Sequence, residues 1–178
     1  ALLTDKIDVE TYQLHREPKV WFWQDCQDDF DYIIRKPDHF KGAPALIVSL
    51  SDHVSYERIT RVVGEDISIW AITLEHPHND FMQAKQQLSL FRKRLRSLIV
   101  DIKREHGEGA PLHVFPVMPV SCAVEFGRAR MPKADMPWVI YDHDMDCAFY
   151  TSAAADADAS DGLRCGRDWS DKQATTTL

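Results

Sequence analysis

Short runs of β-branched and apolar residues alternate with helical patterns along this chain, and that alternation limits its fold more than any other feature. Residues 45–50 and 67–74 predict buried strands, and each is followed by a helical pattern, over residues 51–63 and 81–106. Residues 112–116 predict a third strand, residues 121–130 a short helix and residues 138–141 a fourth strand. Strands that alternate with helices form βα units around a mainly parallel sheet. We therefore predict an α/β, Rossmann-like fold.

The boundaries of these elements carry their own signals. Ser51 or Asp52 is expected to cap the first helix and Gly64 to end it, and Gly107 is expected to end the second. Before residue 42, residues 19–23 and 30–35 predict two more strands, added antiparallel at one edge of the sheet. The apolar residues of the long helix recur at three- and four-residue steps and predict its buried face: Leu88, Phe91, Leu95, Leu98, Ile99 and Ile102.

Composition excludes several classes of protein. The net charge is −7, whereas general binding to duplex DNA depends on many Lys and Arg side chains. No apolar run approaches the roughly 18 residues that a membrane span needs, and residues 1–5 lack the features of a signal peptide. The four cysteines are widely separated and contain no C-x-x-C pair, which is typical of reduced thiols. We expect a cytoplasmic protein with no membrane association.

No motif indicates catalysis, a metal or a cofactor. Glycine-rich phosphate loops are absent from the sequence, which disfavours dinucleotide dehydrogenases and P-loop ATPases. His76 and His78 lack a third ligand at a recognisable spacing, and exposed loop histidines are the simpler interpretation. His113 is interpreted as a packed histidine of a strand. Cys122 has no activating base nearby in the sequence, so a buried thiol is expected there.

Three loops follow the predicted parallel strands, over residues 49–53, 75–81 and 116–121. Because ligands of open α/β sheets bind beyond the carboxyl ends of the strands, these loops are expected to converge on a site. Asp52, Asn79 and Asp80 suit base edges or ribose hydroxyls, and Ser121 with its neighbouring N–H groups suits a phosphate. Phe81 offers a ring for stacking. The competing interpretation is that Asp52, Asp80 and Ser121 are only helix caps.

Basic residues gather in two places. Arg128, Arg130 and Lys133 follow the third helix near Trp138 and Tyr141, a combination that suits a ligand with phosphates and purines. A solvated surface is the competing interpretation. Residues 85–104 form a basic helix face, which would also suit an acidic protein partner. In contrast, residues 142–171 contain eight aspartates against two arginines, and we expect this tail to be poorly ordered.

A family resemblance rests on five segments. The run LHVFPVMPVSCAVEFGR (residues 112–128), with MPKADMP (131–137) and WVIY (138–141), closely resembles the C-terminal signature of SAVED domains, the cyclic-oligonucleotide sensors of bacterial CBASS antiphage systems. The segment GEDISIWAITL (64–74), with NDFM (79–82), resembles most the version fused to an HNH endonuclease. The resemblance implies three parts: residues 1–17 as a lead-in or linker, residues 18–145 as the sensor domain, and residues 146–178 as an Asp- and Ala-rich segment.

The resemblance also implies a fold and a function. The fold would be two joined CARF-like units, and the ligand a cyclic di- or trinucleotide made by a partner nucleotidyltransferase of the CD-NTase class. Binding would drive homo-oligomerisation and activate a fused HNH DNA endonuclease. This sequence holds no HNH segment, so we expect the sensor alone, without nuclease activity and without a cofactor. The expected ligand-binding residues are Trp23, Phe81 and Tyr141 for stacking, Lys85, Ser121, Arg128 and Lys133 for phosphates, and Asp52, Asn79, Asp80 and Pro119 in the loops.

Two other functions stay open on the sequence alone. Some CARF relatives cleave cyclic oligonucleotides, so a ring nuclease is the first alternative. The second is a protein-interaction domain that uses the basic helix of residues 85–104. Neither the bases, the linkage and the ring size of the ligand nor the stoichiometry of the assembly can be read from these residues.

Overall fold

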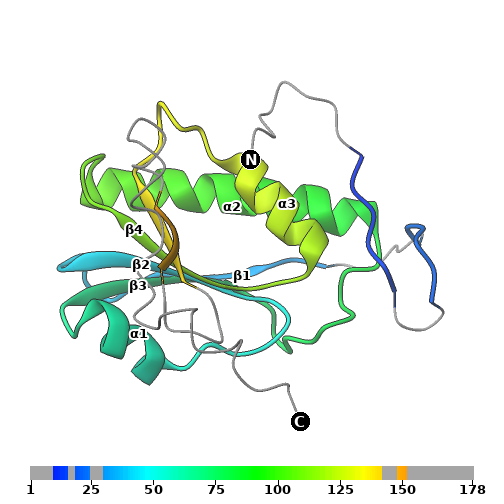
Figure 1. The fold of residues 1–178 in the computed structure, drawn as a ribbon, viewed down its shortest axis with the longest axis horizontal. Helices are drawn as coiled ribbons and strands as arrows, with labels where there is room; N and C mark the ends of the chain where they lie inside the picture. The colour runs from blue at the N-terminus through cyan, green and yellow to red at the C-terminus, as the bar shows by residue number, and fades with distance from the viewer. Residues whose placement is uncertain (1–9, 16–18, 25–29, 142–147, 152–178) are drawn as a thin grey trace, which may run out of the picture.

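The computed structural model describes residues 10–15, 19–24, 30–141 and 148–151. Six strands form one sheet in the order β1-β3-β2-β4-β5-β6 (Figure 1). The four inner strands, β2 (Ala43–Ser49), β3 (Ile67–Thr73), β4 (Leu112–Val117) and β5 (Trp138–Tyr141), are parallel to their inner neighbours. The predicted α/β fold with a mainly parallel sheet is therefore confirmed, and the pairing of two such units stays a prediction.

Both edge strands are antiparallel to their neighbours. Strand β1 (Ile33–Arg35) pairs with β3, which confirms the antiparallel edge predicted from residues 30–35. The strand predicted over residues 19–23 is wrong, because these residues form an irregular segment. Strand β6 (Ala148–Thr151) pairs with β5. It lies within residues 142–171, the tail expected to be poorly ordered, and the other residues of this tail lie outside the described residues.

Strand β2 lies at the centre of the sheet because its side chains are apolar on both faces. Ala45, Leu46 and Val48 are fully buried, as expected for a strand between two layers of helices. The turn before it requires glycine. Gly42 has a φ of 79°, and a Cβ atom there would lie 2.2 Å from the backbone oxygen of Asp66. This close approach lets the N–H of Ala43 donate to the same oxygen at 3.0 Å, which fixes β2 beside the start of β3.

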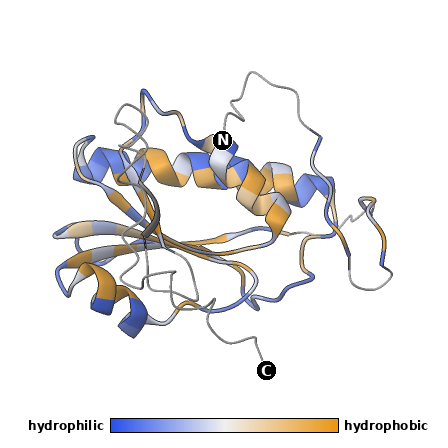
Figure 2. Cartoon of the chain, in the orientation of Figure 1, coloured by the Kyte–Doolittle hydropathy of each residue, from blue (hydrophilic) through white to orange (hydrophobic). Residues whose placement is uncertain are grey.

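Helix α1 (Tyr56–Val63) covers one face of the sheet, and α2 (Lys85–His106) and α3 (Val120–Ala129) cover the other (Figure 1). Helix α1 begins after Ser55, whose Oγ accepts a hydrogen bond from the N–H of Arg58, rather than after the predicted Ser51 or Asp52. It ends at Gly64 as predicted. Figure 2 shows its hydrophobic residues on the side toward the sheet and its hydrophilic residues on the outer side.

Helix α2 begins four residues later than its sequence pattern predicts. The side-chain oxygen of Gln87 accepts hydrogen bonds from the N–H groups of Gln83 and Ala84, at 2.8 and 2.9 Å, and thereby caps the helix start. The helix ends at Gly107, which has a φ of 81°. Every residue of the predicted buried face is buried: Leu88, Phe91, Leu95, Leu98, Ile99 and Ile102.

Apolar side chains fill both sides of the sheet. The larger core lies between the sheet and α2 and α3, and includes Trp70, Phe91 and Trp138. The smaller core lies under α1, where Ile59 packs near Phe115 and Tyr141. Within the described residues, no helix is both long and apolar enough to cross a bilayer. Because the inner strands are parallel, the loops after β2, β3 and β4 all lie at one end of the sheet.

Candidate functional site: a cleft at the carboxyl ends of the strands

The three loops that follow β2, β3 and β4 are bonded directly to one another. The N–H groups of Leu50 and Ser51 both donate to the carbonyl of Val117, at 2.9 and 3.0 Å, which joins the loop after β2 to the end of β4. The N–H of His78, in the loop after β3, donates to the carbonyl of Leu50 at 3.1 Å. The expected convergence of the three loops is therefore confirmed.

An open cleft of about 650 Å³ lies where these loops meet. This volume falls within the range of roughly 300–1,000 Å³ that is typical of small-molecule sites. Its lining comes from all three loops and from the N-terminal part of the chain: Gln13, Leu14, His15, Lys19, Ser51, Asn79, Pro116, Val117, Met118, Pro119 and Val120.

Residues 10–15 and 19–24 form one wall of the cleft, and we call them the N-terminal strap. Two hydrogen bonds join its halves: the indole Nε1 of Trp23 donates to the carbonyl of Thr11, and the N–H of His15 donates to the carbonyl of Val20, both at 2.9 Å. Figure 1 shows the strap beside the end of the molecule where α2 begins. The Trp23 side chain is thus part of the strap and packs against the larger core, rather than lining the cleft.

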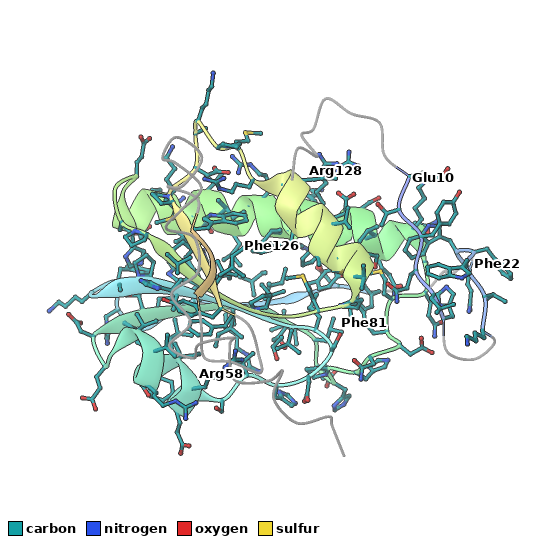
Figure 3. All side chains as sticks on the ribbon, in the orientation of Figure 1. Glu10, Phe22, Arg58, Phe81, Phe126 and Arg128 are labelled. Atoms are coloured by element: carbon teal, nitrogen blue, oxygen red, sulfur yellow. The ribbon has the colours of Figure 1, made fainter. Side chains whose placement is uncertain are left out.

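Two further hydrogen bonds hold the strap against the rest of the domain. The hydroxyl of Ser121, in the first turn of α3, donates to the side-chain oxygen of Gln13 at 2.8 Å. The N–H of Gln24 donates to the carbonyl of Gln83 at 2.9 Å, just before α2. The tip of the strap is exposed, and Figure 3 shows Phe22 projecting away from the body of the domain.

The sequence interpretation misses Gln13, His15 and Lys19. All three line the cleft because the strap folds back across it, and this is a long-range arrangement that no local pattern announces. In the sequence, only the positive charge of Lys19 points to a phosphate-binding role, and it stands beside aromatic residues that are typical of a strand. Lys19 is exposed and is the sole Lys or Arg side chain among the lining residues.

The N-terminus of α3 opens onto the cleft through Pro119 and Val120. Pro119 occupies the N-cap position without a side-chain hydrogen bond, and the first intrahelical bond of this turn runs from the N–H of Ala123 to the carbonyl of Pro119. The N–H groups of Val120, Ser121 and Cys122 therefore precede the regular hydrogen-bond ladder. Such groups and the helix dipole favour anions.

The predicted loop residues divide into two groups. Asn79 and Pro119 line the cleft, and Ser121 lies directly behind its wall, fully buried and bonded to Gln13. Asp52 and Asp80 are not among the lining residues. The carboxylate of Asp52 instead accepts a hydrogen bond from the N–H of His53 at 2.7 Å, and Ser55 rather than Asp52 caps α1.

The predicted phosphate-binding cations lie away from the cleft. Arg128 is in the last turn of α3, about 12 Å along the helix from Val120, and is buried beside Glu125, 3.7 Å away (Figure 3). Lys133 is exposed beyond the end of that helix. Lys85 begins α2 and forms an exposed ion pair with Glu10 at 3.4 Å. None of the three lines the cleft.

Two of the predicted stacking residues are core residues. Phe81 is 5% exposed and packs against Phe30, with ring centroids 6.3 Å apart (Figure 3). Tyr141 lies in the smaller core, stacked 4.8 Å from Phe115, and its hydroxyl is 2.8 Å from Nδ1 of His113. Burial raises the pKa of Tyr141. Both rings are buried, stack on protein rings and do not line the cleft, so the structure lends no support to the expectation that they stack on a ligand.

The remaining titratable groups have structural explanations. His78 is exposed and its Nδ1 lies 2.9 Å from the carbonyl of His76, which fits the interpretation of loop histidines. His113 is packed in its strand as predicted, and burial lowers its pKa. Cys122 is buried as predicted, and burial raises its pKa, so it is a poor nucleophile. Among the described residues, no cluster of three or more His, Cys, Asp or Glu is arranged to hold a metal ion.

These features define an α/β domain with an open cleft at the carboxyl ends of its parallel strands. The sequence matches the SAVED family, described as the SMODS-associated and fused to various effectors sensor domain, over residues 1–154, and the chain belongs to this family. No curated protein matches the chain.

Solved structures with a similar fold include the SAVED/CARF-domain-containing receptor Cap4 of Acinetobacter baumannii. Its complex with the cyclic trinucleotide 2′3′3′-cAAA aligns with a TM-score of 0.48 and 15% identity, over 65% of this chain and 25% of the receptor. Its complex with 3′3′3′-cAAA aligns with a TM-score of 0.47 and 16% identity, over 72% of this chain and 28% of the receptor. The aligned part thus spans about a quarter of the receptor's length.

Proposed function

We propose that this domain binds a cyclic di- or trinucleotide second messenger in the cleft at the carboxyl ends of β2, β3 and β4. Membership of a family of sensor domains supports the class of function. The observation that carries the assignment is that the N-terminus of α3 and the ammonium group of Lys19 belong to the same cleft. A site with helix N–H groups and a lysine in its lining suits a ligand with more than one phosphate.

The remaining polar lining suits the nucleoside parts of such a ligand. Asn79 is exposed and carries both a donor and an acceptor, as needed to pair with a base edge. Ser51 contributes a hydroxyl from the neighbouring loop. Pro116, Met118 and Pro119 supply apolar surface against which a base or a ribose can pack. The lining residues contain no carboxylate and no thiol, so they favour binding over cleavage of the ring.

Ligand binding is expected to control an effector that is fused to the sensor domain. The family description places these sensor domains in fusion with effectors. We propose that ligand binding drives self-association and thereby activates a fused effector, and the resemblance of residues 64–82 favours an HNH DNA endonuclease as that effector. A CD-NTase would supply the ligand.

The contrast between two lysines tests the position of the site. Lys19→Ala should weaken the binding of a cyclic di- or triadenylate, because it removes the sole Lys or Arg of the lining. Lys133→Ala is the matched control, since it removes an equal charge from an exposed position outside the cleft. Calorimetry gives the affinities, and ligand at 100 times Kd should stabilise the wild-type domain by about 2.7 kcal/mol. Equal losses in the two variants would contradict the placement, and no binding of any ring by the wild type would contradict the function.

The two alternative functions make different predictions. A ring nuclease would convert the ligand to linear products, which chromatography after incubation detects, whereas a sensor returns it intact. For a docking helix, the cations of α2 would need to be available to a partner. Instead, Arg94 pairs with Asp31, and Arg96 lies 2.6 Å from Asp135. These two ion pairs tie part of the basic face of α2 to the rest of the domain.

A further inference from the structure

His15 stands apart from the other residues of the cleft because it is a polar side chain that is almost completely buried. It lines the cleft, yet only 1% of its surface is exposed. Its ring is held in place on two sides. Nε2 lies 3.0 Å from the carbonyl oxygen of Phe22, and the ring meets the indole of Trp23 edge to face, with centroids 6.5 Å apart.

The bond to Phe22 fixes the hydrogen-bonding character of the other ring nitrogen. A carbonyl oxygen only accepts, so Nε2 must carry the hydrogen in this contact. In a neutral imidazole, Nδ1 is then an acceptor. Nδ1 of His15 is buried and has no hydrogen-bond partner among the described residues. Since His15 lines the cleft, the strap holds a preset acceptor at the cleft wall that receives no hydrogen bond from the described part of the chain.

A buried acceptor without a donor costs free energy, and native structures seldom retain one without a reason. The open volume next to this ring is the cleft itself. His15 presents a hydrogen-bond acceptor, whereas the N-terminus of α3 presents hydrogen-bond donors. Phosphate oxygens suit the α3 end, whereas a group with an N–H or O–H suits His15. One wall of the cleft thus suits hydrogen-bond acceptors of a ligand, and another wall suits its donors.

We propose that His15 is a specificity-determining residue of the cleft, whose Nδ1 accepts a hydrogen bond from an N–H or O–H donor of the bound ligand. In a cyclic oligonucleotide the donor is either an amino group of a base or a ribose hydroxyl. The inference rests on the proposed function, because it assumes that such a ring occupies the cleft. It goes beyond that function by naming the group that the strap selects.

The test removes each donor from the ligand in turn. The probes are cyclic di- and triadenylates with 3′–5′ linkages, because the base edge of adenine carries one amino donor. One analogue has purine bases without the 6-amino group, and the other has 2′-O-methyl riboses. The wild-type domain should bind one of the two analogues roughly 10- to 100-fold more weakly than the parent ring. The analogue affected identifies the donor.

Two variants show whether His15 causes this preference. His15→Gln keeps a donor that can reach the carbonyl of Phe22 but removes the acceptor at the δ position, so the preference should fall to near onefold. His15→Asn keeps an acceptor near the δ position and should restore part of it. The melting temperature of each variant reports whether the strap and the domain stay folded.

The possible outcomes are separate. A wild-type domain that binds the parent and both analogues equally overturns the role of His15, even where a variant fails to fold. A preference that persists in His15→Gln, or a variant that binds every ring equally more weakly, also overturns it and leaves the proposed function standing. A wild-type domain that binds no cyclic di- or trinucleotide of any base contradicts the proposed function itself.

Discussion

The substitution Val120→Pro tests whether the N-terminus of α3 holds a phosphate. Val120 is the first residue of the helix, and its side chain is 76% exposed, so the change removes little packing. Proline is well tolerated at this position because the N–H that it lacks has no partner inside the helix. Pro119 already has the extended conformation, φ −62° and ψ 156°, that a following proline requires. The helix should therefore remain while the cleft loses one N–H.

The expected effect follows from the strength of a hydrogen bond to a charged group. Such a bond contributes about 1.5–3 kcal/mol, so the affinity for a cyclic adenylate should fall roughly 10- to 150-fold. Val120→Ala is the control, because it shortens the side chain but keeps the N–H. Isothermal titration gives the two affinities, and urea unfolding should show equal stabilities. Equal affinities of the proline and alanine variants would refute a phosphate at this N–H.

Three further predictions concern the frame that holds the site. Ser121→Ala should lower the free energy of unfolding by about 1 kcal/mol in urea, because it removes the donor to Gln13; an unchanged midpoint would contradict this bond. Gly42→Ala should destabilise the domain clearly, because a Cβ would lie 2.2 Å from a backbone oxygen, whereas Gly109→Ala, with open space around it, should change little. Burial lowers the pKa of His113, so the unfolded chain binds more protons near pH 6 and stability should fall as the pH drops from 7.5 to 5.5. His113→Asn should make that dependence shallower, and an identical slope would show that His113 is not its source.

The order and kind of the βα elements follow from local sequence patterns. The buried run of β2 and the three- and four-residue spacing in α2 are set by the faces that each element buries, so the pattern and the structure coincide. Segments that depend on distant partners were predicted less well. The aromatic residues among 19–23 are typical of a strand, but the indole of Trp23 donates a hydrogen bond to the carbonyl of Thr11, and the segment forms part of the strap. β6 is four residues long and lies inside an Asp-rich tail, so its strand depends on the pairing with β5 rather than on a local pattern.

The site shows the same division between local and distant information. The convergence of the loops follows from parallel strands, and Asn79 and Pro119 line the cleft for this reason. Arg128 lies near the C-terminal end of α3, so the length of the helix separates it from the helix N-terminus at the cleft. The loop position of Phe81 predicts a ring that stacks on a ligand. The same position, just before α2, also allows the ring to pack into the core, where it is buried. The position of Lys19 at the cleft depends on the path of the strap, which no local sequence pattern predicts.

Hydrogen exchange at the start of α3 tests the central assignment most directly. The amides of Val120, Ser121 and Cys122 precede the first intrahelical bond of Ala123, so they depend on the ligand for protection that the helix ladder does not give. Saturating cyclic di- or triadenylate should slow their exchange and that of the strap around Gln13. Binding that leaves these amides unchanged, with protection instead at the far end of α3 around Arg128, would contradict the placement of the ligand in this cleft.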